Sequence, residues 1–284
     1  MELVAPAKIN LSLKVLGRQR DGYHQIESLF QPLDFGDKIL LKRSSGGGLK
    51  LFCPNSDLPQ DSANLAFRAA ELFFEKTGIT PGLEVTLDKN IPLAAGLGGG
   101  SSDAAAVLKG ANHLFGRPFS KADLEKMGLS LGADVPFFIW ARPAWARGVG
   151  HILSPASLPR FHYVLVNPGF QVSSAWAYAA LRKPLTEAPA VDTIVPLFIE
   201  SYQDLLPLAN DLEPVVEKAW PIIAEVRQKL LASGAKLARM SGSGPTVFGL
   251  FEDDNQARTA ARFLERHSLK MNRPWRIILT QGRS

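Results

Sequence analysis

The stretch of sequence that decides the fold is a glycine-rich loop, Pro92-Leu93-Ala94-Ala95-Gly96-Leu97-Gly98-Gly99-Gly100-Ser101-Ser102. An alanine-rich run with helical character follows it, over residues 103–114. Four glycines and two alanines remove side chains where a backbone could wrap an anion, and the start of a helix attracts negative charge. Ser101 and Ser102 can cap that helix or offer hydroxyls to a phosphate or a magnesium ion. The loop therefore predicts a polyphosphate site.

Two common phosphate-binding motifs do not match this loop. A Walker A motif needs a Gly-Lys pair, and the chain contains none. The dinucleotide fingerprint needs glycine at its last position, where this chain has Ser101 when counted from Gly96 and Asp103 when counted from Gly98. A tight strand–helix connection without a ligand is the alternative, which the number of small residues disfavours.

An alternating strand is expected near the N-terminus. Its apolar face carries Ile9, Leu11, Leu13 and Val15, and its polar face carries Lys8, Asn10, Ser12 and Lys14. This period of two predicts a half-buried strand with Lys8, Asn10 and Ser12 on one side. Two more strands, over residues 38–42 and 49–53, are expected to form a hairpin through the glycine-rich connection 44–48.

The remaining periodic segments predict an α+β protein of two domains. The N-terminal part adds helices over residues 64–76 and 121–131 and a strand over residues 83–87. The C-terminal part contains expected strands over residues 163–166, 236–240, 246–251 and 275–279, and expected helices over residues 174–181, 214–231 and 255–267. Proline and glycine between residues 142 and 160 place the boundary near residue 157, which gives domains 1–157 and 158–284.

Composition excludes several classes of protein. Of the 284 residues, 46% are apolar and 21% are charged, which is typical of a globular chain. The single cysteine, Cys53, excludes an internal disulfide and a cysteine-based zinc cluster. No apolar run reaches the about 18–20 residues of a membrane span and no signal peptide is recognisable, so we expect a cytoplasmic protein without a membrane partner. The net charge of +5 comes from dispersed residues, which does not favour nucleic-acid binding.

A second glycine-rich segment, Met240-Ser241-Gly242-Ser243-Gly244-Pro245-Thr246, lies between two expected strands. By itself it predicts a hairpin turn. Alternatively, the two glycine-rich loops of the chain face each other across a cleft.

Three segments resemble, in order and spacing, the motifs of the GHMP small-molecule kinases. They are residues 5–11, residues 92–102 and residues 240–247. Two further segments are similar to the branch that acts on a cytidine-diphosphate ester of methylerythritol, namely Arg20-Asp21-Gly22-Tyr23-His24 and Gly132-Ala133-Asp134-Val135-Pro136-Phe137-Phe138. The resemblance covers residues 3–250, and the five motifs together are specific.

The resemblance implies a fold and an activity. The fold would pair an N-terminal ribosomal-protein-like α/β domain with a C-terminal ferredoxin-like sandwich, with the active site in the cleft between them. The activity would be ATP-dependent phosphorylation of the 2-hydroxyl of CDP-methylerythritol, a step of non-mevalonate isoprenoid precursor biosynthesis. ATP would lie on residues 92–102 with magnesium, for which Ser102 is the candidate ligand. The alternatives are a GHMP kinase for homoserine, mevalonate or a sugar, and an RNA-binding α+β protein.

The resemblance also implies roles for single residues. Asp134, which by its position before Val135-Pro136 could equally be a helix cap or a turn residue, would be the catalytic base. Lys8 would be its electrostatic partner, and Asn10 would orient the substrate. Tyr23 would stack on the cytosine, and His24 would hydrogen-bond to it. Tyr178 is the candidate for a second stacking ring or, equally, a core residue.

Overall fold

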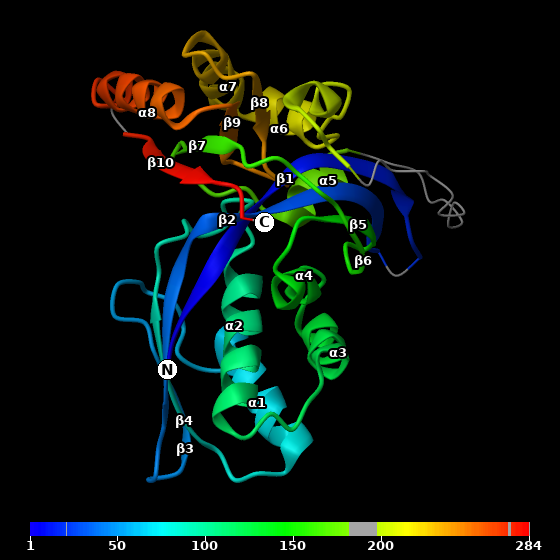
Figure 1. Ribbon diagram of the computed structural model, residues 1–284, viewed down its shortest axis with the longest axis vertical. Helices are drawn as coiled ribbons and strands as arrows, with labels where there is room; N and C mark the ends of the chain where they lie inside the picture. The colour runs from blue at the N-terminus through cyan, green and yellow to red at the C-terminus, as the bar shows by residue number, and fades with distance from the viewer. Residues whose placement is uncertain (21, 182–197, 272–273, 284) are drawn as a thin grey trace. The chain divides into compact units, whose positions relative to one another are not determined.

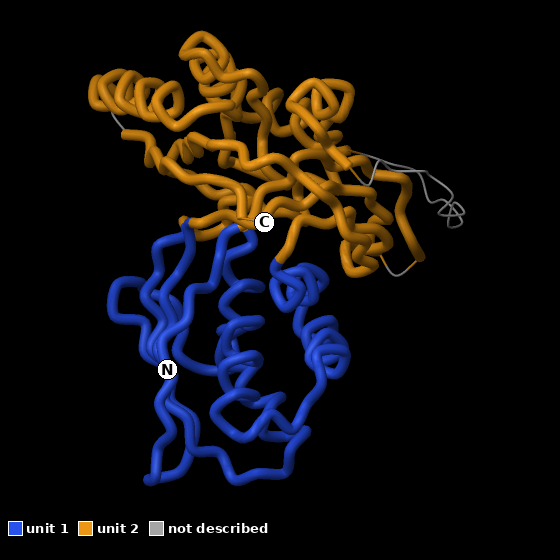
Figure 2. Tube along the Cα trace, viewed as in Figure 1, with its two compact units in different colours: residues 1–7, 35–91, 98–141 blue, residues 8–34, 92–97, 142–284 orange. Residues whose placement is uncertain are grey.

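The computed structural model describes residues 1–20, 22–181, 198–271 and 274–283. The chain forms two compact units, each assembled from separate stretches of sequence. Unit 1 contains residues 1–7, 35–91 and 98–141, and unit 2 contains residues 8–34, 92–97 and 142–284 (Figure 2). The domain boundary near residue 157 therefore stays a prediction about sequence segments, because the two units are not consecutive along the chain.

One sheet has the strand order β3-β4-β2-β5-β6, with β1 paired to β2. Its strands are β1 (Glu2–Arg18), β2 (His24–Arg43), β3 (Gly48–Phe52), β4 (Gly82–Asp88), β5 (Ala144–Gly148) and β6 (Ile152–Pro155). In unit 1, β4 pairs antiparallel with the second half of β2 and parallel with β3. In unit 2, the first half of β2 pairs with β5, which pairs with β6.

The expected hairpin between residues 38–42 and 49–53 is wrong. Strand β4 lies between β2 and β3, so these two strands are not neighbours. The amide groups at both ends of the glycine-rich turn show the cause, because Ser44 N donates to Gly82 O and Gly48 N donates to Pro81 O. The backbone of this turn therefore bonds to the start of β4, and β4 separates the two strands that the turn connects.

Four helices complete unit 1 (Figure 1), namely α1 (Leu65–Thr77), α2 (Gly99–Leu114), α3 (Lys121–Leu131) and α4 (Val135–Trp140). The predicted helix at residues 64–76 is present as α1, which Asn64 caps and which ends at Gly78 in a left-handed conformation. Phenylalanine rings at positions 73, 74, 115 and 119 pack edge to face or tilted between the helices. The thiol of Cys53 is buried beside Asn64.

Unit 2 contains a second, fully antiparallel sheet in the order β10-β7-β9-β8. Its strands are β7 (His162–Asn167), β8 (Leu237–Met240), β9 (Val247–Phe251) and β10 (Arg276–Gln281). The helical elements of this unit are α5 (Ser174–Ala180), η1 (Tyr202–Leu205), α6 (Glu213–Ala219), α7 (Ile222–Ala232) and α8 (Asp254–Ser268). Helices α7 and α8 pack against this sheet (Figure 1). The expected α+β pattern with an antiparallel sheet is present.

The single helix expected over residues 214–231 is divided into α6 and α7. The break falls at Trp220 and Pro221, because proline has no amide hydrogen for the helical ladder and restricts the residue before it. Leu13, Val15 and Ile26 from β1 and β2 join the apolar core of this unit.

Strand β1 is buried on both faces between Ala5 and Leu13, which corrects the expectation of a half-buried strand there, whereas Lys14 is exposed as expected. Lys8 is 5% exposed, Asn10 1% and Ser12 4%. Burial of these polar side chains is tolerated because each is hydrogen-bonded within the protein.

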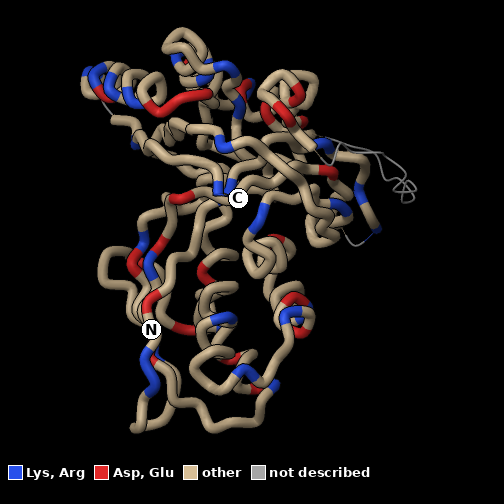
Figure 3. Tube along the Cα trace, in the orientation of Figure 1, with Lys and Arg blue, Asp and Glu red and all other residues tan. Residues whose placement is uncertain are grey.

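The charged residues are spread along both units (Figure 3). Among the described residues, no helix is long and apolar enough to cross a membrane.

Candidate functional site

The glycine-rich loop is held in unit 2 through three successive carbonyl groups. Leu97 O accepts from Lys8 N at 3.0 Å, and Ala95 O accepts from Thr246 N at 3.4 Å. Between them, Gly96 O accepts from the Ser241 hydroxyl at 2.9 Å. The structure thus brings together the loop, the N-terminal strand motif and the second glycine-rich segment, which lie far apart in the sequence.

The amide side of the same loop is shaped for an anion. Ala94, Gly96 and Gly98 have φ of 48°, 75° and 72°, so left-handed residues alternate along the backbone. Such alternation turns successive amide groups toward one concavity. Within the described chain, the amides of residues 96–101 donate to no protein group. Gly96 has no substitute, since a Cβ there would lie 2.2 Å from Ser241 O.

Helix α2 starts earlier than predicted, at Gly99, with Gly98 as its N-cap. Ser101 and Ser102 therefore lie within the first turn and do not cap the helix, which corrects that possibility. The Ser102 hydroxyl instead donates to Pro6 O at 2.6 Å. That bond ties the helix start to β1 within unit 1 and leaves the lone pairs of the Ser102 oxygen as its remaining ligand capacity.

Lys8 and Asn10 form the centre of a buried polar network in unit 2. Lys8 Nζ donates to Asn10 Oδ1 at 2.7 Å and lies 4.3 Å from the centre of the Phe30 ring. Asn10 N donates to the Ser241 hydroxyl at 3.1 Å, and Asn10 Nδ2 donates to the Ser28 hydroxyl at 2.9 Å. Lys8 is therefore not a solvated surface lysine, and both side chains have fixed positions.

The turn between β8 and β9 is the expected hairpin connection, and it also contacts this network. Asn210 Nδ2 donates at 2.8 Å to both Met240 O and Gly242 O. A Cβ on Gly242 would lie 3.1 Å from Asn10 Oδ1, and φ at this residue is +57°. Glycine is needed here both for the conformation and for the close approach of Asn10.

Two of the predicted base-binding residues stack on each other in unit 2. The rings of His24 and Tyr178 are 4.8 Å apart with an angle of 24° between their planes. Tyr178 also packs against the core, as the alternative interpretation expected, and its role as a second stacking ring stays a prediction. Tyr23, next to His24, is 61% exposed. An exposed tyrosine beside a stacked pair offers aromatic surface to a ligand.

The protonation state of His24 suits recognition of a base edge. Burial, and then the positive charge of Arg18, lowers the pKa of His24 from its ordinary value of 6.5. At neutral pH the imidazole is therefore uncharged, with one nitrogen donating and the other accepting.

Helix α5, which carries Tyr178, is linked to the turn after β8 by a 2.8 Å hydrogen bond between the hydroxyls of Ser174 and Ser243.

Asp134 lies in unit 1, at the N-cap position of α4. Its backbone is in the right-handed helical region, and its side chain makes no capping hydrogen bond. A capping aspartate has an extended backbone and accepts from the first turn of the helix. The alternative role as a helix cap therefore does not apply, and the role as a base stays a prediction.

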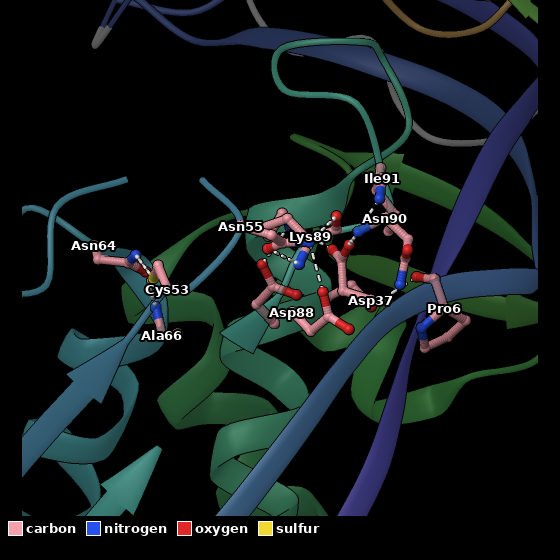
Figure 4. A network of polar contacts seen from close by, with 12 residues as sticks. Pro6, Asp37, Cys53, Asn55, Asn64, Ala66, Asp88, Lys89, Asn90 and Ile91 are labelled. Carbon is pink, nitrogen blue, oxygen red and sulfur yellow. Dashed lines mark hydrogen bonds and ion pairs between the residues drawn. The ribbon is translucent and has the colours of Figure 1, made fainter. Parts of the chain in front are cut away.

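Unit 1 also contains a buried ionic cluster that no sequence motif indicated, here named the loop clasp and consisting of Asp37, Lys89 and Asp103. Figure 4 labels Asp37 and Lys89 of this cluster. Lys89 Nζ donates to Asp37 Oδ2 and, at 2.7 Å, to Asp103 Oδ2. Asp37 Oδ1 accepts from the amides of Asn90 and Ile91 at 2.5 and 2.7 Å. One carboxylate of β2 thus holds the residues before the glycine loop and, through Lys89, it is linked to Asp103 in the N-terminal part of α2 after the loop.

The clasp carries two carboxylates for one ammonium in a site almost closed to water. Burial, together with the negative charge of Asp37, raises the pKa of Asp103 to about 8, although Lys89 opposes the shift. Burial works against the charge of Lys89, but the carboxylates of Asp103 and Asp37 outweigh it and raise the pKa of Lys89. Since neutral pH lies below this value, Asp103 is mainly protonated there, which lowers the negative charge that the cluster holds away from water. No pattern of spacing in the sequence marks these three residues as neighbours.

The described residues hold no group of three or more His, Cys, Asp or Glu side chains arranged for a metal ion. This donor set does not fit a dedicated metal cage. It fits a magnesium ion held mainly by the phosphates of a ligand, which needs few protein ligands.

Two family models match this chain, one in its N-terminal half and one in its C-terminal half. The N-terminal domain of the GHMP kinases matches residues 64–142, and the C-terminal domain of the GHMP kinases matches residues 195–269. The first range contains the glycine loop, the clasp residues Lys89 and Asp103, and Asp134.

Individual relatives extend over nearly the whole chain. A 4-diphosphocytidyl-2-C-methyl-D-erythritol kinase of Syntrophotalea carbinolica is 48% identical over 268 residues, which is 93% of this chain and 94% of the relative. The crystal structure of a 4-(cytidine 5'-diphospho)-2C-methyl-D-erythritol kinase superposes with a TM-score of 0.82 at 37% identity and full coverage of both chains. A homoserine kinase from Cytophaga hutchinsonii has a TM-score of 0.78 at 20% identity, covering 99% of this chain and 94% of its own, and is similar in fold. The predicted two-domain α+β fold is confirmed.

Proposed function

Because this chain belongs to the GHMP kinases, in the branch of the 4-diphosphocytidyl-2-C-methyl-D-erythritol kinases, we propose that it phosphorylates the 2-hydroxyl of that cytidine diphosphate ester. The phosphoryl donor is ATP, as expected for this family. The reaction is a step of non-mevalonate isoprenoid precursor biosynthesis. Full-length similarity at 37–48% identity supports this substrate over those of the more distant GHMP kinases.

The observation that carries the choice of substrate is the stacked pair of His24 and Tyr178 beside the exposed ring of Tyr23. A cytosine has two faces that stack on aromatic rings and an edge with both donors and acceptors. A neutral His24 can bond to such an edge through either nitrogen. Homoserine and mevalonate have no base, so they would leave this group of rings unused.

The loop of residues 92–102 is proposed to hold the phosphates of ATP. Its amide groups from residue 96 to residue 101 have no protein partner among the described residues, and the start of α2 adds the positive end of the helix dipole. The carbonyl groups of the loop face the other way, toward Lys8, Ser241 and Thr246. The loop is therefore already ordered with its donors available, which favours binding and positioning of an anion.

The transfer step is proposed to be direct. The 2-hydroxyl oxygen forms a bond to the γ-phosphorus as the bond from that phosphorus to the β–γ bridging oxygen breaks, and ADP leaves. Asp134 receives the hydroxyl proton, Lys8 stabilises the developing alkoxide, and Asn10 orients the polar groups of the substrate. Magnesium, when bound with ATP, supplies neutralisation of the phosphate charge, and Ser102 is the residue proposed to hold it.

The test is a panel of acceptor alcohols in an assay of ADP release with purified protein. The cytidine diphosphate ester, the same methylerythritol phosphate without its cytidylyl group, homoserine and mevalonate are each offered with ATP. We expect the cytidine ester to exceed every other acceptor by at least about 100-fold in kcat/KM, since stacking and edge recognition of a base are together worth several kcal/mol. A preference for homoserine or mevalonate would overturn the proposed substrate.

A further inference from the structure

We propose that Ser28 is a positioning residue that fixes the orientation of the Asn10 amide and, through Asn10, the place of the Lys8 ammonium. The inference deepens the proposed function and rests on it for the roles of Lys8 and Asn10. Ser28 itself belongs to none of the motifs that identify the family. It lies on β2, is fully buried, and contacts Asn10 from the neighbouring strand β1.

The direction of each hydrogen bond around Ser28 follows from counting protons. The Ser28 hydroxyl lies against the carbonyl oxygen of Ser12, which can only accept, so the single hydroxyl proton is donated there. The Ser28 oxygen can then only accept from Asn10. The Asn10 group facing Ser28 is therefore the NH₂ group, and the Asn10 oxygen must face Lys8.

A flipped Asn10 amide would fail on both sides. Its oxygen would meet the Ser28 oxygen with no proton between them, and its NH₂ group would meet the Lys8 ammonium, which is a donor only. Both groups are buried, so neither lost hydrogen bond could be replaced by bulk water. Ser28 thus selects one of two amide orientations that have almost the same shape.

A second serine holds the backbone of the same residue by the same principle. The Ser241 hydroxyl donates its proton to Gly96 O and accepts from the Asn10 amide nitrogen. Asn10 is therefore fixed at its main chain by Ser241 and at its side chain by Ser28. Of these two contacts, only the one with Ser28 acts on the side-chain amide, where it favours the same orientation as the Lys8 ammonium does.

The consequence concerns where the positive charge of Lys8 is held. Its ammonium lies between Asn10 Oδ1 at 2.7 Å and the Phe30 ring at 4.3 Å. Without Ser28, the Asn10 NH₂ group loses its buried acceptor and the amide is held less firmly, so the acceptor that Asn10 offers to Lys8 is less fixed in position. A displacement of about 1 Å in a catalytic group can cost on the order of 100-fold in rate, whereas substrate binding elsewhere is unaffected.

The test compares three variants of the full chain. Ser28→Ala removes the hydroxyl, and Ser28→Thr or, if the added methyl does not fit, Ser28→Cys restores a donor at the same place. Ser12→Ala is the matched control, because the Ser12 hydroxyl is equally buried and accepts from Leu29 N at 3.1 Å but does not touch Asn10. We expect S28A to lower kcat by about tenfold or more, with KM for ATP and for the cytidine ester changed less than about twofold. Rescue by S28T or S28C and unchanged kcat in S12A complete the expected pattern.

A second measurement needs no substrate and separates this proposal from the proposed function. In the NMR spectrum, the side-chain NH₂ of Asn10 is expected to exchange slowly with water in the native protein, the rescue variant and S12A, and quickly in S28A. Slow exchange in S28A, or an equal loss of kcat in S28A and S12A, would overturn the proposal. If the enzyme rejected the cytidine ester while the exchange pattern held, the proposed substrate would fail and the role of Ser28 would stand.

Discussion

Lys8 is 5% exposed, and its environment explains how the chain tolerates a buried lysine. Moving an ammonium out of water costs several kcal/mol unless partners replace the lost hydration. Asn10 Oδ1 replaces one hydrogen bond, and the face of the Phe30 ring adds a cation–π contact. These two contacts hold the ammonium in one place, as we expect of a residue that stabilises negative charge on a substrate.

Asp134→Asn isolates the proposed base. We expect kcat to fall by about 100- to 10,000-fold, because an amide cannot take up the hydroxyl proton, with KM for ATP little changed. Steady-state kinetics with saturating cytidine ester measures both. The matched control is Asp123→Asn in α3, where an exposed aspartate forms a capping box with Ser120, so that stability decreases slightly and kcat does not. Near-native turnover of D134N would refute the assignment.

At the scale of elements, the loop clasp gives the glycine loop fixed ends. Asp37 on β2 holds the chain that leads into the loop, and Lys89 links it to Asp103 in the N-terminal part of α2. Glycine-rich segments lose more backbone entropy on ordering than other sequences do. Fixed ends reduce the freedom that remains to be lost when an anion binds, which lowers the cost of binding.

The two carboxylates of the clasp are expected to respond differently to conversion into amides. Asp37 uses both oxygens as acceptors, so Asp37→Asn places an NH₂ group against donors, and KM for ATP should rise by about tenfold. Asp103→Asn keeps an oxygen for Lys89 and resembles the protonated acid, so KM at pH 7 should stay within about twofold. ATP titrations of both purified variants decide the matter, and equal effects on KM would contradict this account of the clasp.

The same pair of variants predicts a dependence of stability on pH. With its pKa raised from 3.8 to about 8 in the folded state, Asp103 holds a proton that the unfolded chain has lost between these values. Its contribution to the free energy of unfolding therefore decreases as pH rises from about 4 to 8. Urea unfolding should show D103N gaining stability relative to the native protein over this range and levelling off above it.

At the scale of the whole molecule, the two units share strands and cannot be separated by one cut. Unit 2 takes Leu13, Val15 and Ile26 into its core, and Leu13 also bridges to Asn210. A fragment of residues 158–284 would lack these contacts and leave its apolar face exposed.

We therefore expect fragment 158–284 to lack cooperative thermal unfolding and near-ultraviolet circular dichroism when expressed alone. Co-expression with residues 1–157 should restore both, because the missing part of the core is then supplied by the second chain. Independent cooperative folding of either fragment would contradict the shared core and would favour consecutive domains divided near residue 157.

Periodicity and turn chemistry were sufficient to predict the elements that depend on local sequence. The helix capped by Asn64 and stopped by Gly78 and the antiparallel strands of the second sheet are examples. The place of β4 between β2 and β3 was not predictable, because it depends on pairing between distant segments and the glycine turn is compatible with both arrangements.

The residues of the candidate site likewise fall into those that the sequence could predict and those that it could not. Motifs predicted the loop, the resemblance suggested Lys8, Asn10 and His24, and Tyr178 was the candidate for a second stacking ring. The roles of these four residues stay predictions. Ser28 and the clasp were missed, because a serine in a strand or a single lysine before a loop carries no pattern, and its importance arises only from a partner contributed by another segment. A buried polar strand face such as that of β1 is the one clue, since it requires partners on the neighbouring strand.

The place of Cys53 has a practical consequence for spectroscopy. It is the one cysteine of the chain, its thiol is buried beside Asn64, and burial raises its pKa. Maleimide dyes react with exposed thiolates, so we expect the native protein to react with them very slowly. A cysteine introduced for Leu93, which is 41% exposed at the entry to the glycine loop, would carry a single fluorophore without any need to remove the native thiol. Nucleotide binding could then be followed in real time through the fluorescence intensity of this dye.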